Sequence, residues 1–191
     1  KVIQKRHIFK CCSGNLLLLL HRSVIHVEVC GKVREQKQSS VELQVKPLNK
    51  GVESTLFKNN DRFSLEFKSA ASGYVAVFIR DDNNDIVNVM MPYDNSDGNA
   101  REVKSNKDYV FLCTQDPEYP YAEETILTTS KSIENNTLIV VFSQKKFHIS
   151  LSNMGEFVPE VENDNFQKWI HGLRVYDTTV QVEEIVLTIK K

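Results

Sequence analysis

The chain has 191 residues, of which 41% are hydrophobic and 26% are charged, a balance typical of a folded soluble domain and unlike a disordered tail or a fibre. Lysine and arginine total 24 residues against 25 aspartates and glutamates, and the two signs alternate along the chain. Because nucleic-acid binding needs a basic stripe, no nucleic-acid partner is expected. No stretch approaches the roughly 20 apolar residues that span a bilayer, so no transmembrane segment is expected.

The composition changes near residue 40. Ile25, Val27 and Val29 alternate with other residues as in a strand, but Lys32 to Ser40 has the polar composition of a linker. We therefore expect two parts: residues 1–40 as an extension or a remnant of a neighbouring domain, and residues 41–191 as a β-rich domain. Two states stay open for Cys30, a free thiol or a disulfide to Cys11 or Cys12.

The first predicted strands alternate apolar and polar residues. Val41 to Val45 has this period, and Pro47 then ends the strand or marks an edge. In Arg62 to Lys68 the residues Phe63, Leu65 and Phe67 share one face. Both patterns indicate half-buried strands.

A hairpin follows. Gly73 to Ile79 is apolar on both faces and is too short for a globular helix, which predicts a central strand. Asp81 to Asp85 is rich in turn residues, and Ile86 to Met91 is the predicted return strand. Together they predict an antiparallel hairpin with a five-residue loop.

The middle of the chain predicts short strands separated by turns. Tyr109 to Cys113 and Thr125 to Thr129 are expected to be strands, with a proline-braced loop between them. Asn135 and Asn136 predict a turn, after which the apolar run Leu138 to Phe142 predicts another strand.

Only one helix is expected. Phe166, Trp169, Ile170 and Leu173 recur at helical spacing, which predicts a short helix near Asp164–Leu173, capped by Asn163 or Asp164 and closed by Gly172. Val180 to Ile189 is strand-like, but its apolar phase changes. A bulge near Glu183 and Glu184 is the expected reason.

These elements predict a mainly β fold, an antiparallel β-sandwich or a barrel-like sheet with one short helix. The most strongly patterned strands should supply one core between two sheets, formed by Phe63, Leu65, Phe67, Val75, Val77, Leu138 and Val140.

The segment GYVAVFIRDDNNDIVNVMMP, Gly73 to Pro92, and the later LIVVFSQKKF, Leu138 to Phe147, resemble a bacterial family catalogued as domain of unknown function forty-three eighty-four. The pattern of this family is a strand with Gly-Tyr, a return strand that ends near a proline, and a later apolar strand that ends in Ser or Thr. The matching residues here are Gly73, Tyr74, Pro92 and Ser143. Met90 and Met91 depart from it, because an aromatic residue or leucine often precedes the proline. The resemblance implies an add-on module of envelope or secreted proteins, and hence an extracytoplasmic location. It implies no catalytic residues.

The cysteines, histidines and acidic turns are the residues that could carry chemistry in this sequence. A cysteine hydrolase centred on Cys113, with His148 or His171 as the base, is the alternative function, but no glycine-rich elbow surrounds this cysteine. The turn Asp81 to Asp85 and the loop Asp94 to Gly98 do not have the order of a calcium loop. No metal or other cofactor is expected.

Tyr119 and Tyr121 are the predicted partner-binding residues. They lie between Asp116 and Glu124, beside Pro117 and Pro120, and aromatic rings on a restricted loop bury large areas at low entropic cost. Packing of both rings against the sandwich edge is the other interpretation. We therefore expect a non-enzymatic interaction module whose partner is a protein or another envelope component.

Overall fold

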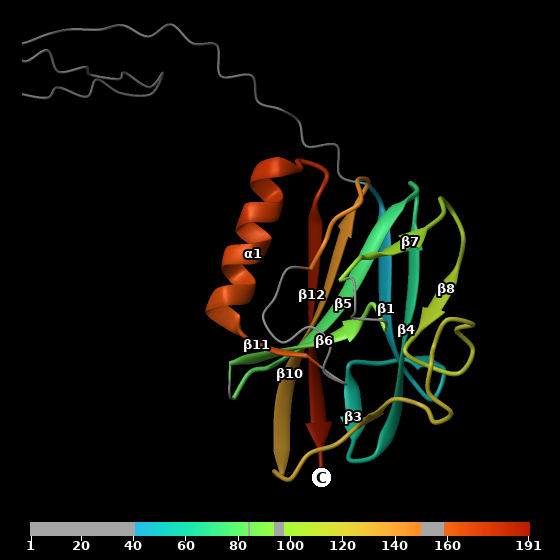
Figure 1. Cartoon of the computed structure of the whole chain (residues 1–191). Helices are drawn as coiled ribbons and strands as arrows, with labels where there is room; N and C mark the ends of the chain where they lie inside the picture. The colour runs from blue at the N-terminus through green and yellow to red at the C-terminus, as the bar shows by residue number, and fades with distance from the viewer. Residues whose placement is uncertain (1–40, 84, 94–97, 150–158) are drawn as a thin grey trace, which may run out of the picture. The chain divides into compact units, whose positions relative to one another are not determined.

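Two β-sheets pack face to face, with one helix on the outer side of the larger sheet (Figure 1). This computed structural model describes residues 41–83, 85–93, 98–149 and 159–191. Within these ranges the fold is mainly β, as predicted, and no closed barrel forms. The predicted extension over residues 1–40, with its three cysteines, lies outside the described residues and stays a prediction.

The smaller sheet has five strands in the order β2-β1-β4-β8, and β9 pairs with the start of β4. Its strands are β1 (Leu43–Asn49), β2 (Val52–Glu53), β4 (Asp61–Ser69), β8 (Tyr109–Phe111) and β9 (Ile126–Leu127). β1 continues through Pro47, which pairs with Leu65, so this proline does not end the strand. β8 stops at Phe111 because Leu112 takes a left-handed conformation (φ 63°), which no regular strand accommodates.

The larger sheet has seven strands in the order β11-β6-β5-β10-β12-β3, and β7 pairs with β5. Its strands are β3 (Leu56–Lys58), β5 (Gly73–Asp81), β6 (Ile86–Met91), β7 (Arg101–Val103), β10 (Ile133–Ser143), β11 (Glu160–Glu162) and β12 (Gln181–Lys190). The predicted hairpin of β5 and β6 is confirmed. Because Asp81 pairs with Ile86, its loop is one residue shorter than expected.

The core between the two sheets contains the residues that the alternation of the sequence predicts. All seven predicted core residues belong to one cluster, and each is at most 1% exposed. Phe67 lies at its centre, with its ring centroid 5.8 Å from that of Phe111 and 6.3 Å from that of Phe142.

A second apolar cluster lies under the helix α1 (Asn163–Tyr176), on the opposite face of the larger sheet. Phe166 packs against Phe78 at a ring distance of 4.9 Å. The helix is confirmed, but both predicted ends are wrong: the N-cap is Glu162, without a side-chain capping bond, and not Asn163 or Asp164, and Gly172 does not close the helix. The last helical residue is Tyr176, and the amide of Asp177 still donates to the carbonyl of Leu173 at 2.9 Å. Gly172 therefore lies within α1, before its last turn ends.

The predicted turn at Asn135 and Asn136 is also wrong, because both residues lie inside β10. Asn135 pairs with Thr188 of β12, and Asn136 pairs with both Asp81 and Leu187. Asn135 is exposed and Asn136 is half-buried, and pairing with β12 and β5 overrides their preference for turns.

The predicted bulge in β12 is wrong as well, because β12 pairs with β10 in unbroken register from Gln181 to Lys190. The apolar phase changes because different layers cover the two ends of this strand. Val182 packs against the cluster under the helix, whereas Ile185 and Leu187 face the core between the sheets. A regular strand therefore carries two apolar phases.

Candidate functional site

The loop from Asp116 to Glu124, here called the tyrosine loop, leaves the smaller sheet after β8 and returns at β9. It contains Tyr119 and Tyr121, the predicted partner-binding residues. The amide of Asp116 donates to the carbonyl of Cys113, and the amide of Tyr119 donates to the carbonyl of Asp116, both at 3.0 Å. The loop therefore begins with two successive turns.

A buried carboxylate fixes the start of the loop. Asp116 is 4% exposed and forms a bidentate ion pair with Arg101 of β7, in which Nη2 donates to Oδ1 at 2.8 Å and Nη1 donates to Oδ2. The phenol of Tyr93 donates to Oδ2 at 2.7 Å. The amide of Glu118 donates to Oδ1 at 3.2 Å. One side chain thus joins the loop to β7 and to the segment after β6.

The charges of this cluster are stabilised by each other and by aromatic rings. Burial alone would raise the pKa of Asp116, but hydrogen bonds from Arg101 and Tyr93 hold that pKa below its usual value. The guanidinium of Arg101 lies 4.8 Å from the ring centroid of Phe111, within the range of a cation–π contact. Burial raises the pKa of the Tyr93 phenol well above its usual value, so Tyr93 acts as a neutral donor.

The two predicted tyrosines continue a row of aromatic rings. Tyr93 and Tyr119 meet edge to face at 5.3 Å, and Tyr119 and Tyr121 do so at 5.2 Å. The hydroxyl of Tyr119 shares a hydrogen bond of 2.9 Å with Thr125. Both Tyr119 and Tyr121 are half-buried. Each ring is therefore held in place and still presents part of its surface to solvent.

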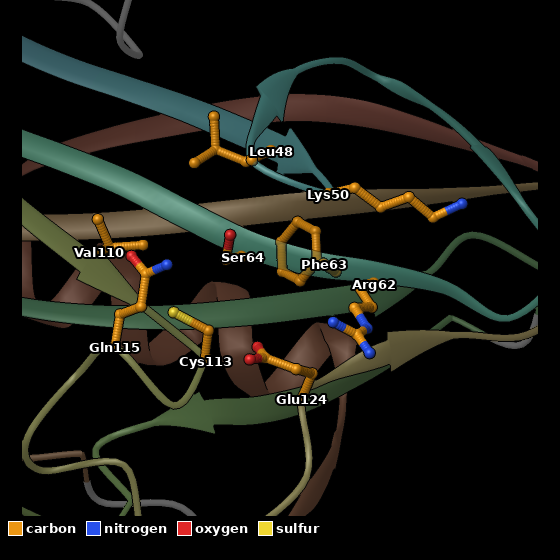
Figure 2. Close-up of a pocket in the computed structure, with 10 residues that line it drawn as sticks. Leu48, Lys50, Arg62, Phe63, Ser64, Val110, Cys113, Gln115 and Glu124 are labelled. Carbon is orange, nitrogen blue, oxygen red and sulfur yellow. The ribbon is translucent and has the colours of Figure 1, made fainter.

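Cys113 lines an open pocket of about 710 Å³ beside the loop, on the side of the smaller sheet that faces away from the larger one. Figure 2 shows its thiol pointing toward Gln115, with the carboxylate of Glu124 on the other side of Cys113 and Arg62 beyond Glu124. Cys113 is 4% exposed, as expected from its apolar neighbours. Burial raises the pKa of its thiol, and the nearby carboxylate of Glu124 acts in the same direction, so the reactive thiolate is disfavoured.

The structure does not bring together the residues of the alternative cysteine hydrolase. His171 is on α1, and the carbonyl of His148 accepts a hydrogen bond of 3.2 Å from Trp169 of the same helix. Both histidines therefore accompany the helix, on the far side of the larger sheet from Cys113. The described lining of the Cys113 pocket includes no histidine.

The described ranges also offer no metal centre and no membrane-spanning helix. They contain no group of three His, Cys, Asp or Glu side chains placed to hold a metal ion. The acidic turn at Asp81 is instead tied by local bonds, since the Asp81 carboxylate accepts from the amide of Asn83 at 2.8 Å. No helix in this part of the chain is long and apolar enough to cross a membrane.

Comparisons with protein-family models, with curated proteins and with solved structures gave no match. The resemblance to domain of unknown function forty-three eighty-four therefore stays a prediction, and so does the location that it implies.

Sequence reasoning missed Arg101 and Tyr93, which hold the loop in place. A signal for Arg101 exists in the pattern of β7, where Arg101 and Val103 are buried and Glu102 is exposed. An arginine in the apolar phase of a strand indicates a buried cation that needs an anion. The sequence around Tyr93 carries no comparable signal, since an aromatic residue after a proline is equally typical of simple packing.

Proposed function

We propose that this domain is a non-enzymatic interaction module of a secreted or cell-envelope bacterial protein, and that it binds a protein or another envelope component through the tyrosine loop. The bacterial and envelope part of the proposal comes from the sequence resemblance alone. The binding part is supported by the way the structure holds the loop.

The anchoring of Asp116 is the observation that carries this proposal. Its ion pair with Arg101 and its bond from Tyr93 order the start of the loop before any partner arrives. Pro117 and Pro120 restrict the backbone on either side of Tyr119. Little conformational entropy is therefore lost on binding, and aromatic rings held in this way are efficient recognition groups.

Replacing Tyr121 by serine tests the proposal most directly, because the hydroxyl bond to Thr125 belongs to Tyr119 and is left intact. We expect Tyr121→Ser to melt within a few degrees of the parent and to lose the protein that the immobilised parent domain captures from a bacterial envelope extract. Capture is measured by quantitative mass spectrometry.

Tyr176→Ser is the matched control, since Tyr176 is 87% exposed at the end of α1 and far from the loop along the chain. It removes the same side chain and should leave capture unchanged. If Tyr121→Ser keeps the captured protein, or if both variants lose it equally, the tyrosine loop is not the binding surface.

A further inference from the structure

The outer edge of strand β12 is only partly paired within the described ranges. The inner side of β12 pairs with β10 along its whole length, but on its outer side β3 pairs only with Thr188, Ile189 and Lys190. From Gln181 to Leu187 no strand among the described residues covers the outer side. An uncovered strand of this length is a template for pairing with another chain.

The backbone groups on this edge can be assigned by alternation. Thr188 donates its amide outward to the carbonyl of Thr55 at 2.9 Å, and the carbonyl of Lys190 accepts outward from Asn59 at 2.7 Å. Neighbouring residues of a paired strand alternate in direction, so Val182, Glu184 and Val186 also direct their amides and carbonyls outward. Within the described chain these groups have no backbone partner.

The edge of the smaller sheet next to this part of β12 is formed by β1, and within the described ranges it is also partly unpaired. β2 pairs only with Leu48 and Asn49, which leaves the first part of β1 without an outer partner in the part of the chain that is described. Val45 of β1 and Ile185 of β12 both pack against the core and both remain partly exposed. Partly exposed apolar side chains from both sheets therefore lie beside the outer edge of β12.

The exposed side chains along this edge indicate what kind of segment can bind there. Glu183 and Glu184 are exposed, and within the described ranges neither forms an ion pair or a side-chain hydrogen bond. A second copy of β12 paired antiparallel about Glu184 would set the two Glu184 carboxylates against each other, which is unfavourable. A basic segment would neutralise them. Ile185 and Val186 follow directly, and Val186 is 55% exposed, so apolar residues fit opposite them.

We propose that the outer edge of β12 binds an extended segment of a partner protein, which adds as an antiparallel strand and carries two adjacent basic residues opposite Glu183 and Glu184 and two adjacent β-branched residues opposite Ile185 and Val186. Main-chain hydrogen bonds to Val182, Glu184 and Val186 supply the affinity, and the alternating side chains supply the specificity. This surface is separate from the tyrosine loop, which lies beyond the other end of the smaller sheet at β8 and β9.

The probe is a fluorescently labelled peptide with the sequence Thr-Val-Val-Lys-Lys-Val. Its antiparallel register places the lysines opposite the two glutamates. We expect saturable binding by fluorescence anisotropy, and no binding of Thr-Val-Val-Glu-Glu-Val. Hydrogen exchange followed by NMR adds an internal control. The peptide should slow exchange at the outward amides of Val182, Glu184 and Val186 and leave Glu183 and Ile185 unchanged, because these two already bond to β10.

Two variants separate edge pairing from simple charge attraction. Val186→Pro removes one outward amide without breaking a bond to β10, and proline is tolerated at such edge positions. It should weaken peptide binding about tenfold, whereas Val186→Thr, which keeps the amide and the branched shape, should bind like the parent. The double variant Glu183→Lys, Glu184→Lys should reverse the preference, so that it binds the glutamate peptide more tightly than the lysine peptide. Tyr121→Ser should bind the lysine peptide normally, so this test is independent of the tyrosine loop.

Three outcomes would overturn the proposal. The first is no binding of the lysine peptide by the parent protein. The second is binding that Val186→Pro leaves unchanged, which would show contact by charge alone. The third is sedimentation of the free protein as a dimer with the outward amides of β12 already protected, which would make a second copy the occupant.

Discussion

The carboxylate of Asp116 and the guanidinium of Arg101 form a buried two-pronged ion pair that joins the tyrosine loop to strand β7. Removing one member of such a pair leaves the other charge buried without its partner, and this is more costly than losing a surface pair. The pair therefore contributes to both the stability of the domain and the order of the loop.

We expect Asp116→Asn to lower the free energy of unfolding by about 3–5 kcal/mol at neutral pH, because Arg101 stays buried without its anion. Chemical denaturation measures this change. Asp108→Asn is the matched control, since the carboxylate of Asp108 is 74% exposed in its ion pair with Lys68. Loss of such a surface pair should cost about 1 kcal/mol or less. Similar costs for both variants would contradict the structural role of Asp116.

The cost of Asp116→Asn should also depend on pH. The pKa of Asp116 is lower in the folded protein than in the unfolded chain, so ionised Asp116 contributes its full stability above its unfolded pKa. That contribution is lost as the pH falls through the folded pKa. The difference in unfolding free energy between parent and variant should therefore shrink on acidification below about pH 4. A difference that stays constant down to pH 2 would argue against this ionisation.

Truncation of Phe67 tests the core between the sheets. Phe67 is fully buried and contacts Phe111 and Phe142, so Phe67→Ala should destabilise the domain by about 3–5 kcal/mol through lost burial and a new cavity. The control is Phe67→Leu, which keeps most of the apolar volume and should cost less. A Phe67→Ala variant that melts with the parent would remove this residue from the core.

The thiol of Cys113 should react slowly while the fold is intact, because burial raises its pKa and limits access to it. The measurement is alkylation at neutral pH, with the modified residue assigned by mass spectrometry in the native and the denatured protein. Rapid stoichiometric labelling of native Cys113 would favour the cysteine hydrolase over the interaction module.

Two glycines should respond in opposite ways to substitution by alanine. A Cβ atom at Gly172 would meet no atom within 4 Å, so Gly172→Ala should stabilise α1 by about 0.5–1 kcal/mol. At Gly73 the added atom would lie 2.4 Å from the carbonyl oxygen of Ser143 and 2.6 Å from the ring of Phe142, so Gly73→Ala should lower the melting temperature. Thermal denaturation of both variants measures the contrast, and the same sign for both would contradict it.

Strong local patterns made much of this fold predictable. The alternation of Phe63, Leu65 and Phe67 identified both the strand and the face that it buries, and the helical spacing of Phe166 and Ile170 identified the helix. Predictions failed where tertiary pairing decided the structure. Asn135 lies in a strand because β12 pairs with it, and the phase change in β12 reflects what covers each end of that strand.

The candidate site was less predictable than the fold. The sequence singled out Tyr119 and Tyr121 because prolines flank them, but the residues that hold them lie elsewhere in the chain. Arg101 and Tyr93 reach Asp116 only after the strands have assembled. A contact between residues so far apart in sequence leaves no local pattern, apart from the buried phase of Arg101.

Strands β5 and β10 have a further consequence for how the domain opens. Leu138 and Val140 of β10 face the core between the sheets, while Ile139 and Val141 face the cluster under the helix. Detachment of the helix would thus expose one face of the larger sheet to solvent and leave the face toward the smaller sheet buried. We expect the amides of β5 and β10 to exchange last with solvent, by global unfolding alone, whereas those of α1 exchange through a smaller, local opening.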